Sequence, residues 1–178
     1  MKHVEYKIFT IFNHEAEEKW LNEKAAKGEF LTDVGFCRYV FEDDEPGKYV
    51  YRLEMLDEFP NHYKSVEYLK FLEETDIEHV ASILKWVYLR KKSSEGAFDI
   101  YSDIESRIIH YKRIINLANI LIFIQLIVGI PNLILNLTLT HGSSIYLINL
   151  IIAILFFIGN KSLKEKVSKL EKEKLYRE

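Results

Sequence analysis

Charged side chains disappear from the chain for one long stretch near its carboxyl end. No Lys, Arg, Asp or Glu lies between Arg113 and Lys161, and most of the positions between them are apolar. Apolar runs of this length exceed the core helices of soluble proteins and are typical of membrane-spanning segments. Four small or polar residues at 140–143 divide the stretch. The pattern therefore predicts a transmembrane helix over residues 114–139, an external turn over 140–143 and a second transmembrane helix over 144–160.

Basic residues gather at both outer ends of this hairpin and are absent from its turn. Before the first run and after the second run they are Arg107, Lys112, Arg113, Lys161, Lys164, Lys166 and Lys169. Lys and Arg near the ends of spans mark the cytoplasmic side. We therefore expect both termini in the cytosol and the spans in the cytoplasmic (inner) membrane.

Amide side chains interrupt the apolar pattern of the first run at five positions: Asn116, Asn119, Gln125, Asn132 and Asn136. Amides within a membrane need hydrogen-bond partners. We interpret them as intramembrane packing residues that contact the second span or an identical subunit, which would give a homo-oligomer through the spans. A pathway for an ion or small solute is a second interpretation.

Upstream of the spans, residues 1–98 follow the pattern of a soluble domain. Alternation in residues 3–12 predicts a strand, and a capped helical pattern over residues 13–28 predicts a helix that Gly28 ends. The apolar-rich residues 29–56 predict successive strands, with a hairpin turn at Glu45-Pro46-Gly47-Lys48.

A second helix from about Ser65 and a final strand near residues 79–91 complete this domain. The simplest compact solution is an α+β cytosolic domain, a ferredoxin-like sandwich with an extra strand. A capping box of Ser102 and Glu105 then predicts a juxtamembrane helical stalk over residues 99–113 that runs into the first span.

Charge divides unevenly along the chain, whose formal net charge is −3. Residues 1–113 are acidic, whereas residues 161–178 form a basic amphipathic cytosolic tail, expected either to lie on anionic lipid or to pair with another helix. An acidic domain lacks the basic field that phosphate binding requires, so nucleic acid is disfavoured as a partner. Cys37 is the single cysteine, which excludes an intramolecular disulfide and a thiolate-rich zinc site.

The soluble domain contains few residue patterns that indicate a catalytic or binding site. The helix start at His14 lacks the second histidine of the His-Glu-x-x-His zinc motif, so Glu15, Glu17 and Glu18 are interpreted as a solvated face. Cys37 is interpreted as a small buried group on a strand. Acidic residues at the tip of the expected hairpin are the candidate contact for a basic protein partner: Glu42, Asp43 and Asp44. We identify no catalytic, cofactor-binding or metal-binding residues.

Aromatic residues are frequent in the soluble domain, and two interpretations remain open for them. They could line a ligand groove, although most are expected in the core: Trp20, Trp86, Tyr39, Tyr49, Tyr51 and Tyr88. Trp20 in particular is expected to be structural, because it lies on the inward face of the first helix.

Several stretches resemble a bacterial family, the domain of unknown function 2812. They are "EKWLNEKAAKGEFL", "RYVFEDDEPGKYVYRLEML", "YLKFLEETDIEHVASILKWVYLRKK" and "GAFDIYSDIESRIIHYKRI", and together they cover most of residues 3–115. The resemblance implies a small membrane-anchored domain, often encoded beside PadR-type transcriptional repressors, with no assigned catalytic residues.

Three functions follow as hypotheses. The first is a membrane-anchored cytosolic interaction domain with a regulatory role, which recruits or sequesters a partner such as a PadR-type repressor. The second is an accessory subunit of a membrane transporter, which the amide-rich first span would contact. The third is an enzyme that acts on lipid or envelope precursors, disfavoured because the sequence contains no visible catalytic constellation.

Overall fold

The computed structural model describes residues 2–101, 103–138 and 145–177. The chain divides into two compact units, residues 1–102 and residues 103–178, and each is described by itself. The first unit is built from helices and strands, whereas the second consists of two long helices.

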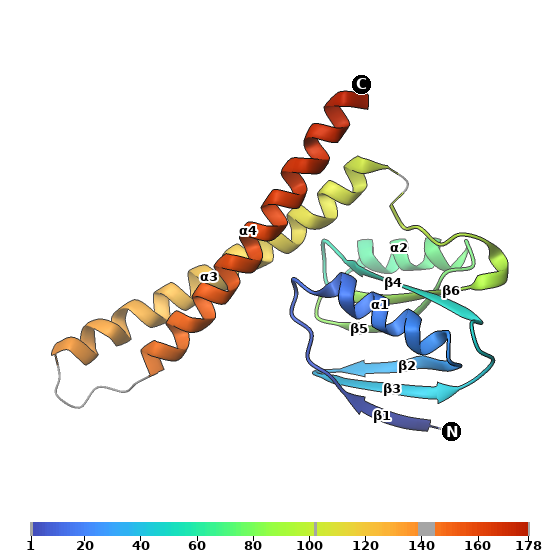
Figure 1. The fold of residues 1–178 in the computed structure, drawn as a ribbon, viewed down its shortest axis with the longest axis horizontal. Helices are drawn as coiled ribbons and strands as arrows, with labels where there is room; N and C mark the ends of the chain where they lie inside the picture. The colour runs from blue at the N-terminus through green and yellow to red at the C-terminus, as the bar shows by residue number, and fades with distance from the viewer. Residues whose placement is uncertain (1, 102, 139–144, 178) are drawn as a thin grey trace. The chain divides into compact units, whose positions relative to one another are not determined.

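The first unit contains the sequence strand, helix, strand, strand twice (Figure 1). The first copy consists of β1 (Lys2–Tyr6), α1 (His14–Ala25), β2 (Glu29–Gly35) and β3 (Arg38–Asp43). The second copy consists of β4 (Tyr49–Met55), α2 (Tyr63–Glu73), β5 (Glu78–Ile83) and β6 (Trp86–Lys92), followed by the short helix η1 (Ser93–Glu95). The expected α+β class is confirmed, in the form of two small antiparallel three-stranded sheets.

The two copies share strand order, register and irregularities, so they are an internal repeat. The strand orders are β1-β3-β2 and β4-β6-β5, with the last strand of each copy in the centre. The hairpin that closes with Gly35 opposite Arg38 recurs 48 residues later, with Ile83 opposite Trp86. A register shift follows Leu31 in β2 and recurs after His79 in β5, at the same spacing.

Strand pairing differs from the sequence expectation in two places. The strands β3 and β4 do not form a hairpin, because β3 is already paired on both edges by β1 and β2. A turn with Gly47 in the left-handed region (φ 72°) is present, but it connects the two sheets. The single final strand expected near residues 79–91 is also wrong: this segment is the hairpin of β5 and β6.

Each helix packs its apolar side on strands of the repeats. In α1, Leu21 and Ala25 are buried, and α2 contributes Leu69 and Leu72 to a cluster with Val87 and other side chains of its copy. Gly28 ends α1 with a positive φ of 87°, and a Cβ there would lie 2.6 Å from the carbonyl oxygen of Asp44. No other residue fits this position without movement of the backbone, so the expected helix stop is confirmed.

Side chains of α1 also cover the free edge of β4. The Asn22 amide donates to the Tyr51 carbonyl (3.0 Å) and accepts from the Tyr51 N–H (2.8 Å), as a neighbouring strand would. The Glu18 carboxylate accepts from the Leu53 N–H (3.0 Å) and from Arg52 (3.2 Å). The helix of the first copy thereby satisfies the edge strand of the second.

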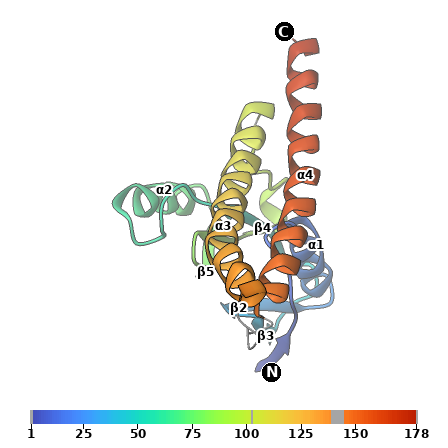
Figure 2. The ribbon, with the colours of Figure 1, turned by 90° about the vertical axis from the view of Figure 1, so that its left-hand side faces the viewer.

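The second unit contains two helices that are long and apolar enough to cross a membrane, α3 (Ile104–Thr138) and α4 (Ile145–Arg177). They pack antiparallel, as Figures 1 and 2 show. The Asp103 carboxylate accepts from the Ser106 N–H (2.6 Å) at the start of α3. The expected cap Ser102 and the external turn at residues 140–143 lie outside the described residues.

Both helices continue well beyond the apolar runs. Lys112 pairs with Glu171 (2.7 Å) and Lys174 pairs with Glu105 (2.9 Å), so the charged part of α4 lies along the start of α3. The tail expected as a separate helix over residues 161–178 is therefore continuous with the second span. Of the two interpretations for it, pairing with another helix is the arrangement observed, because these ion pairs and the buried Leu163 and Val167 hold it there.

Candidate functional site

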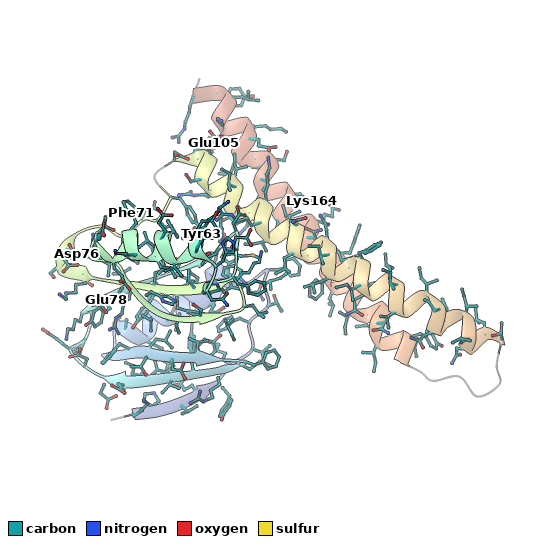
Figure 3. All side chains as sticks on the ribbon, turned by 180° about the vertical axis from the view of Figure 1, so that it is seen from behind. Tyr63, Phe71, Asp76, Glu78, Glu105 and Lys164 are labelled. Atoms are coloured by element: carbon teal, nitrogen blue, oxygen red, sulfur yellow. The ribbon has the colours of Figure 1, made fainter. Side chains whose placement is uncertain are left out.

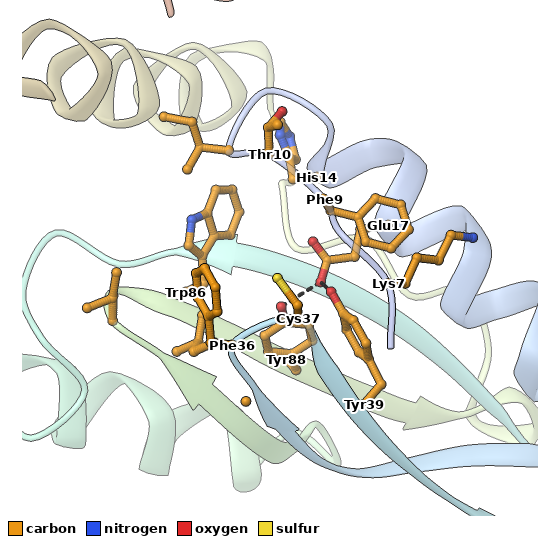
Figure 4. A pocket seen from close by; sticks show the side chains of 14 residues that line it. Lys7, Phe9, Thr10, His14, Glu17, Phe36, Cys37, Tyr39, Trp86 and Tyr88 are labelled. Carbon is orange, nitrogen blue, oxygen red and sulfur yellow. Dashed lines mark hydrogen bonds between the residues drawn. The ribbon is translucent and has the colours of Figure 1, made fainter. Parts of the chain in front are cut away.

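The first unit contains a pocket of about 410 Å³ at one end of the two hairpins. Four segments line it: the chain after β1, the first turns of α1, the turn between β2 and β3, and the end of the β5–β6 hairpin (Figure 4). Because the hairpin ends belong to different copies, the repeat brings together segments that are distant in sequence. The volume lies within the range of small-molecule sites, about 300–1,000 Å³.

Five of the 14 residues that line the pocket are aromatic. They are Phe9, Phe36, Tyr39, Trp86 and Tyr88. Trp86 packs against the imidazole of the buried His14, with 5.3 Å between the ring centroids. Of the aromatic residues singled out in the sequence, three thus line a pocket, whereas Tyr51 is fully buried in the core.

One carboxylate, that of Glu17, lies at the pocket and is 93% buried. Its Oε1 accepts hydrogen bonds from the hydroxyls of Tyr39 (2.7 Å) and Tyr88 (2.5 Å). Burial raises the pKa of Glu17, and the hydrogen bonds from the two tyrosines oppose that rise. Burial and the neighbouring carboxylate raise the pKa values of Tyr39 and Tyr88, which keeps both hydroxyls protonated as donors.

Cys37 lines the same pocket but lies in the β2–β3 turn, where its φ is 56°. The expectation of a buried strand residue is wrong, because the hairpin turns at this position and leaves the thiol half-buried. Within the described part of the chain, no hydrogen bond joins Cys37 to His14 or Glu17. Cysteine nucleophiles are activated by a base within hydrogen-bond reach, and neither of these two groups makes such a contact with Cys37 in the described residues.

Exposed apolar side chains surround the mouth of the pocket. Phe36 is 90% exposed at the β2–β3 turn, and Leu84 is 74% exposed at the β5–β6 turn. Lys7 lies at the rim, with its ammonium 4.5 Å from the centroid of the Trp20 ring. Trp20 itself is half-buried and packs edge-on against Tyr39, with 4.9 Å between the ring centroids.

Sequence reasoning missed Glu17, which it assigned to a solvated face. The assignment holds for the exposed Glu15, whereas Glu17 is buried and Glu18 is half-buried at the edge of β4. A signal was available: Glu17 precedes the inward-facing Leu21 by four residues, which places both on one helix face. The residues that the β5–β6 hairpin contributes to the pocket could be identified only from the pairing of these two strands, which the local sequence pattern did not reveal.

The acidic candidates for a partner contact follow β3, at the connection between the sheets. Glu42 pairs with Lys2 (3.4 Å) and Asp44 pairs with Lys48 (2.5 Å). Asp43 and Asp44 are both exposed. The hydrogen bond from Lys48 lowers the pKa of Asp44. These carboxylates lie outside the pocket, so the structure does not bring the two candidate sites together.

A separate polar cluster joins β1 and β2. The ligand atoms of His3, Glu5 and Glu29 lie within 4.8 Å of one another, a spacing that suits a metal ion. The Lys24 ammonium, however, donates to both carboxylates, to Glu29 at 2.8 Å. Partial burial acts to lower the pKa of Lys24, yet these bonds raise it, so an ion-pair network accounts for the cluster.

The amide candidates of the first span are distributed along α3. Asn119 accepts from Asn160 of α4 (2.7 Å), whereas Asn132 donates to Val128 within its own helix (2.7 Å). Gln125 borders a small cavity between the helices, and Asn116 and Asn136 are exposed and half-buried respectively. Of the five, Asn119 thus makes a polar contact with the second helix.

Outside the pocket, α2 presents exposed apolar side chains. Tyr63 and Phe71 are 68% and 58% exposed, and both are labelled in Figure 3. Such patches mark interaction surfaces when they are contiguous and large.

Comparison with known proteins places the chain in a family. The family model described as "Protein of unknown function (DUF2812)" matches residues 13–124, which include α1, both hairpins and the start of α3. No curated protein and no solved structure matches the chain. The resemblance noted in the sequence is confirmed, and the chain belongs to the DUF2812 family.

Proposed function

We propose that the protein is a membrane-anchored regulatory domain whose soluble unit binds a small apolar molecule at the cytosolic side of the membrane. The observation that carries the proposal is the aromatic pocket at the hairpin ends, with the buried Glu17 in its wall. Small-molecule sites in proteins generally combine apolar walls with a few oriented polar groups, and this pocket has both.

The apolar helices and their basic flanks support the anchoring. Both ends of the hairpin carry Lys and Arg, which favours a cytosolic location for the soluble unit. Binding is proposed in place of catalysis because, among the described residues that line the pocket, no base is hydrogen-bonded to the free thiol of Cys37.

The single cysteine allows a direct test of pocket binding. In membranes that contain the full-length protein, 1-naphthylmethanol, a neutral aromatic probe, should slow the reaction of Cys37 with N-ethylmaleimide in a saturable way. Ile83→Trp, which fills the pocket wall, should abolish the concentration dependence, whereas Val66→Trp on the exposed face of α2 should retain it. A wild-type labelling rate that is independent of the probe would refute the proposal.

The acidic connection supplies the second half of the proposal, the recruitment of a basic protein partner such as a PadR-type repressor. Exposed charges steer association and are screened by salt. The triple variant Glu42→Gln, Asp43→Asn, Asp44→Asn should recover less partner from membranes, and moderate salt should reduce wild-type recovery to a similar level. The Asn at position 44 keeps an oxygen for the Glu45 N–H, which Asp44 now accepts at 2.8 Å. Equal recovery by wild type and variant at both salt levels would remove the acidic connection from the interface.

One observation favours a second function, an accessory subunit of a membrane transporter. The first apolar run carries an exposed amide, that of Asn116 on α3. A polar side chain on a helix of another membrane protein would pair with such an amide. Co-purification that requires α3 and α4 and ignores the soluble unit would support this function over the first.

A further inference from the structure

The pocket contains an acceptor that the protein itself does not use. Both tyrosine hydroxyls donate to Glu17 Oε1, and among the described residues none donates to Oε2. Figure 4 shows the carboxyl group pointing between Trp86 and Tyr39, with Oε1 at the two tyrosines. Oε2 is not among the buried atoms that the protein seals off without a partner, so it is open to a donor that enters the pocket.

Charge in the pocket wall favours a cation at this oxygen. Glu17 is the carboxylate that lines the pocket, while His14 is packed against Trp86 and Lys7 lies exposed at the rim. The Lys7 ammonium lies 5.1 Å from the ring centroid of Phe9 and 4.5 Å from that of Trp20, so these rings hold it at the rim of the pocket. An anionic ligand would bring a second negative charge to the buried carboxylate, which is unfavourable in a low-dielectric environment.

The aromatic wall suits the same ligand. Ring faces attract ammonium groups within about 6 Å of the centroid, and more strongly when water is excluded. The contact of Lys7 with Trp20 is an example in the same cluster of rings. Phe9, Trp86 and Tyr88 supply apolar surface for the remainder of a ligand.

We propose that the pocket binds an organic cation, a primary or secondary amine attached to an aromatic or compact aliphatic group. Its ammonium donates a hydrogen bond to Glu17 Oε2, and its apolar part packs against Trp86 and Phe9. This inference rests on the proposed function, because it names the class of ligand for the same pocket.

Three probes with one ring system separate charge from shape. They are 1-naphthylmethylamine, a cation at neutral pH, the neutral 1-naphthylmethanol, and the anion 1-naphthylacetate. The readout is the probe concentration that halves the rate of Cys37 labelling in membranes of the full-length protein. In the wild type, the cation should act at a concentration at least about tenfold lower than the alcohol, as expected for a charge-assisted hydrogen bond, and the acetate should act at the highest concentration.

Glu17→Gln is the diagnostic variant, since glutamine keeps an oxygen for Tyr39 and Tyr88 and removes the charge. The ratio between alcohol and cation should fall to about 1 in this variant. Glu23→Gln is the matched control, because Glu23 is exposed on the same helix, where it pairs with Lys19 (3.9 Å), and it should keep the wild-type ratio. The thermal unfolding of each variant, followed by tryptophan fluorescence, verifies that the domain is folded.

The outcomes distinguish this inference from the proposed function. Protection by the alcohol without a preference for the cation would overturn the inference and leave the pocket as a neutral site. A cation preference that persists in Glu17→Gln would also overturn it, because the preference would then arise from the membrane or another residue. Absence of protection by the alcohol in the wild type would refute the proposed function and with it this inference.

Discussion

At the scale of single residues, Glu17 supplies the carboxylate in the wall of the aromatic pocket. It lies on the buried face of α1 and is held by two tyrosines from different copies of the repeat, Tyr39 of β3 and Tyr88 of β6. A carboxylate in such a place is destabilising when charged, and proteins retain such groups mostly where they function. Its burial therefore connects the stability of the domain with its proposed ligand.

We expect Glu17→Gln to stabilise the domain more as the pH rises. Burial raises the pKa of Glu17 above its ordinary value of 4.5, so the folded state holds this proton more tightly than the unfolded state. The contribution of Glu17 to the stability of the wild type is therefore greatest below pH 4.5, and it is lost as the pH rises through the raised pKa. The melting temperature of the variant minus that of the wild type should increase between pH 4 and pH 8.

Tryptophan fluorescence reports this melting, because Trp20 and Trp86, the two tryptophans of the chain, both belong to the first unit. Glu23→Gln on the exposed face of α1 controls for the loss of a carboxylate from the helix. A difference between Glu17→Gln and wild type that stays constant with pH would contradict the raised pKa.

At the scale of elements, the interaction between α1 and β4 joins the two repeats. A free edge strand exposes unpaired N–H and C=O groups, and here Asn22 pairs with both groups of Tyr51. The Tyr51 hydroxyl in turn accepts from the Leu31 N–H (2.9 Å), beside the register shift in β2. Polar side chains thus replace the strand pairing that is absent between the two sheets.

We predict that Asn22→Ala lowers the free energy of unfolding by about 1–3 kcal/mol, because it leaves the Tyr51 N–H without its acceptor and leaves the Tyr51 carbonyl with Arg52 as its one remaining donor (3.1 Å) among the described residues. Urea unfolding of the full-length protein, followed by tryptophan fluorescence, measures the change. Glu23→Ala at the next, exposed position should change stability by no more than about 0.5 kcal/mol. Equal effects of the two substitutions would show that the edge of β4 is satisfied in another way.

At the scale of the whole molecule, the helix pair extends past its apolar segments. An α-helix rises 1.5 Å per residue, so the 33 residues of α4 span about 50 Å, which exceeds a hydrocarbon core of about 30 Å. The ion pairs of Glu105 with Lys174 and Lys112 with Glu171 join the excess length of both helices. The two helices therefore form a paired helical stalk beyond their apolar segments.

This pairing predicts proximity between cysteines placed at positions 105 and 174. In a Cys37→Ser background, a short bis-maleimide should join Glu105→Cys and Lys174→Cys within one chain, as mass spectrometry of proteolytic fragments would detect. Lys164 lies ten residues away on α4, about 15 Å along the axis, so Glu105→Cys with Lys164→Cys should join poorly. Similar yields for the two pairs would contradict the observed register.

Orientation in the membrane is tested between the two apolar segments, at the position expected to be external. With Cys37→Ser, a cysteine at Ser143 should react with an impermeant thiol reagent from outside intact cells, because the basic flanks favour cytosolic ends. Cysteine at exposed Glu23 in the soluble unit should react after lysis. Labelling at position 143 that also requires lysis would reverse the predicted orientation.

The sequence by itself determined the features that depend on neighbouring residues. The apolar helices follow from the absence of charge between Arg113 and Lys161, and the end of α1 follows from Gly28, because helix periodicity and turn chemistry are local. Only the tertiary structure decided which strands pair, which positions lie buried, and hence where the pocket lies. Which strands pair with β3 depends on which strand edges are free and which side chains are buried together, and neither is local in sequence. Glu17 lines a pocket only because two hairpins, 48 residues apart, both lie next to it.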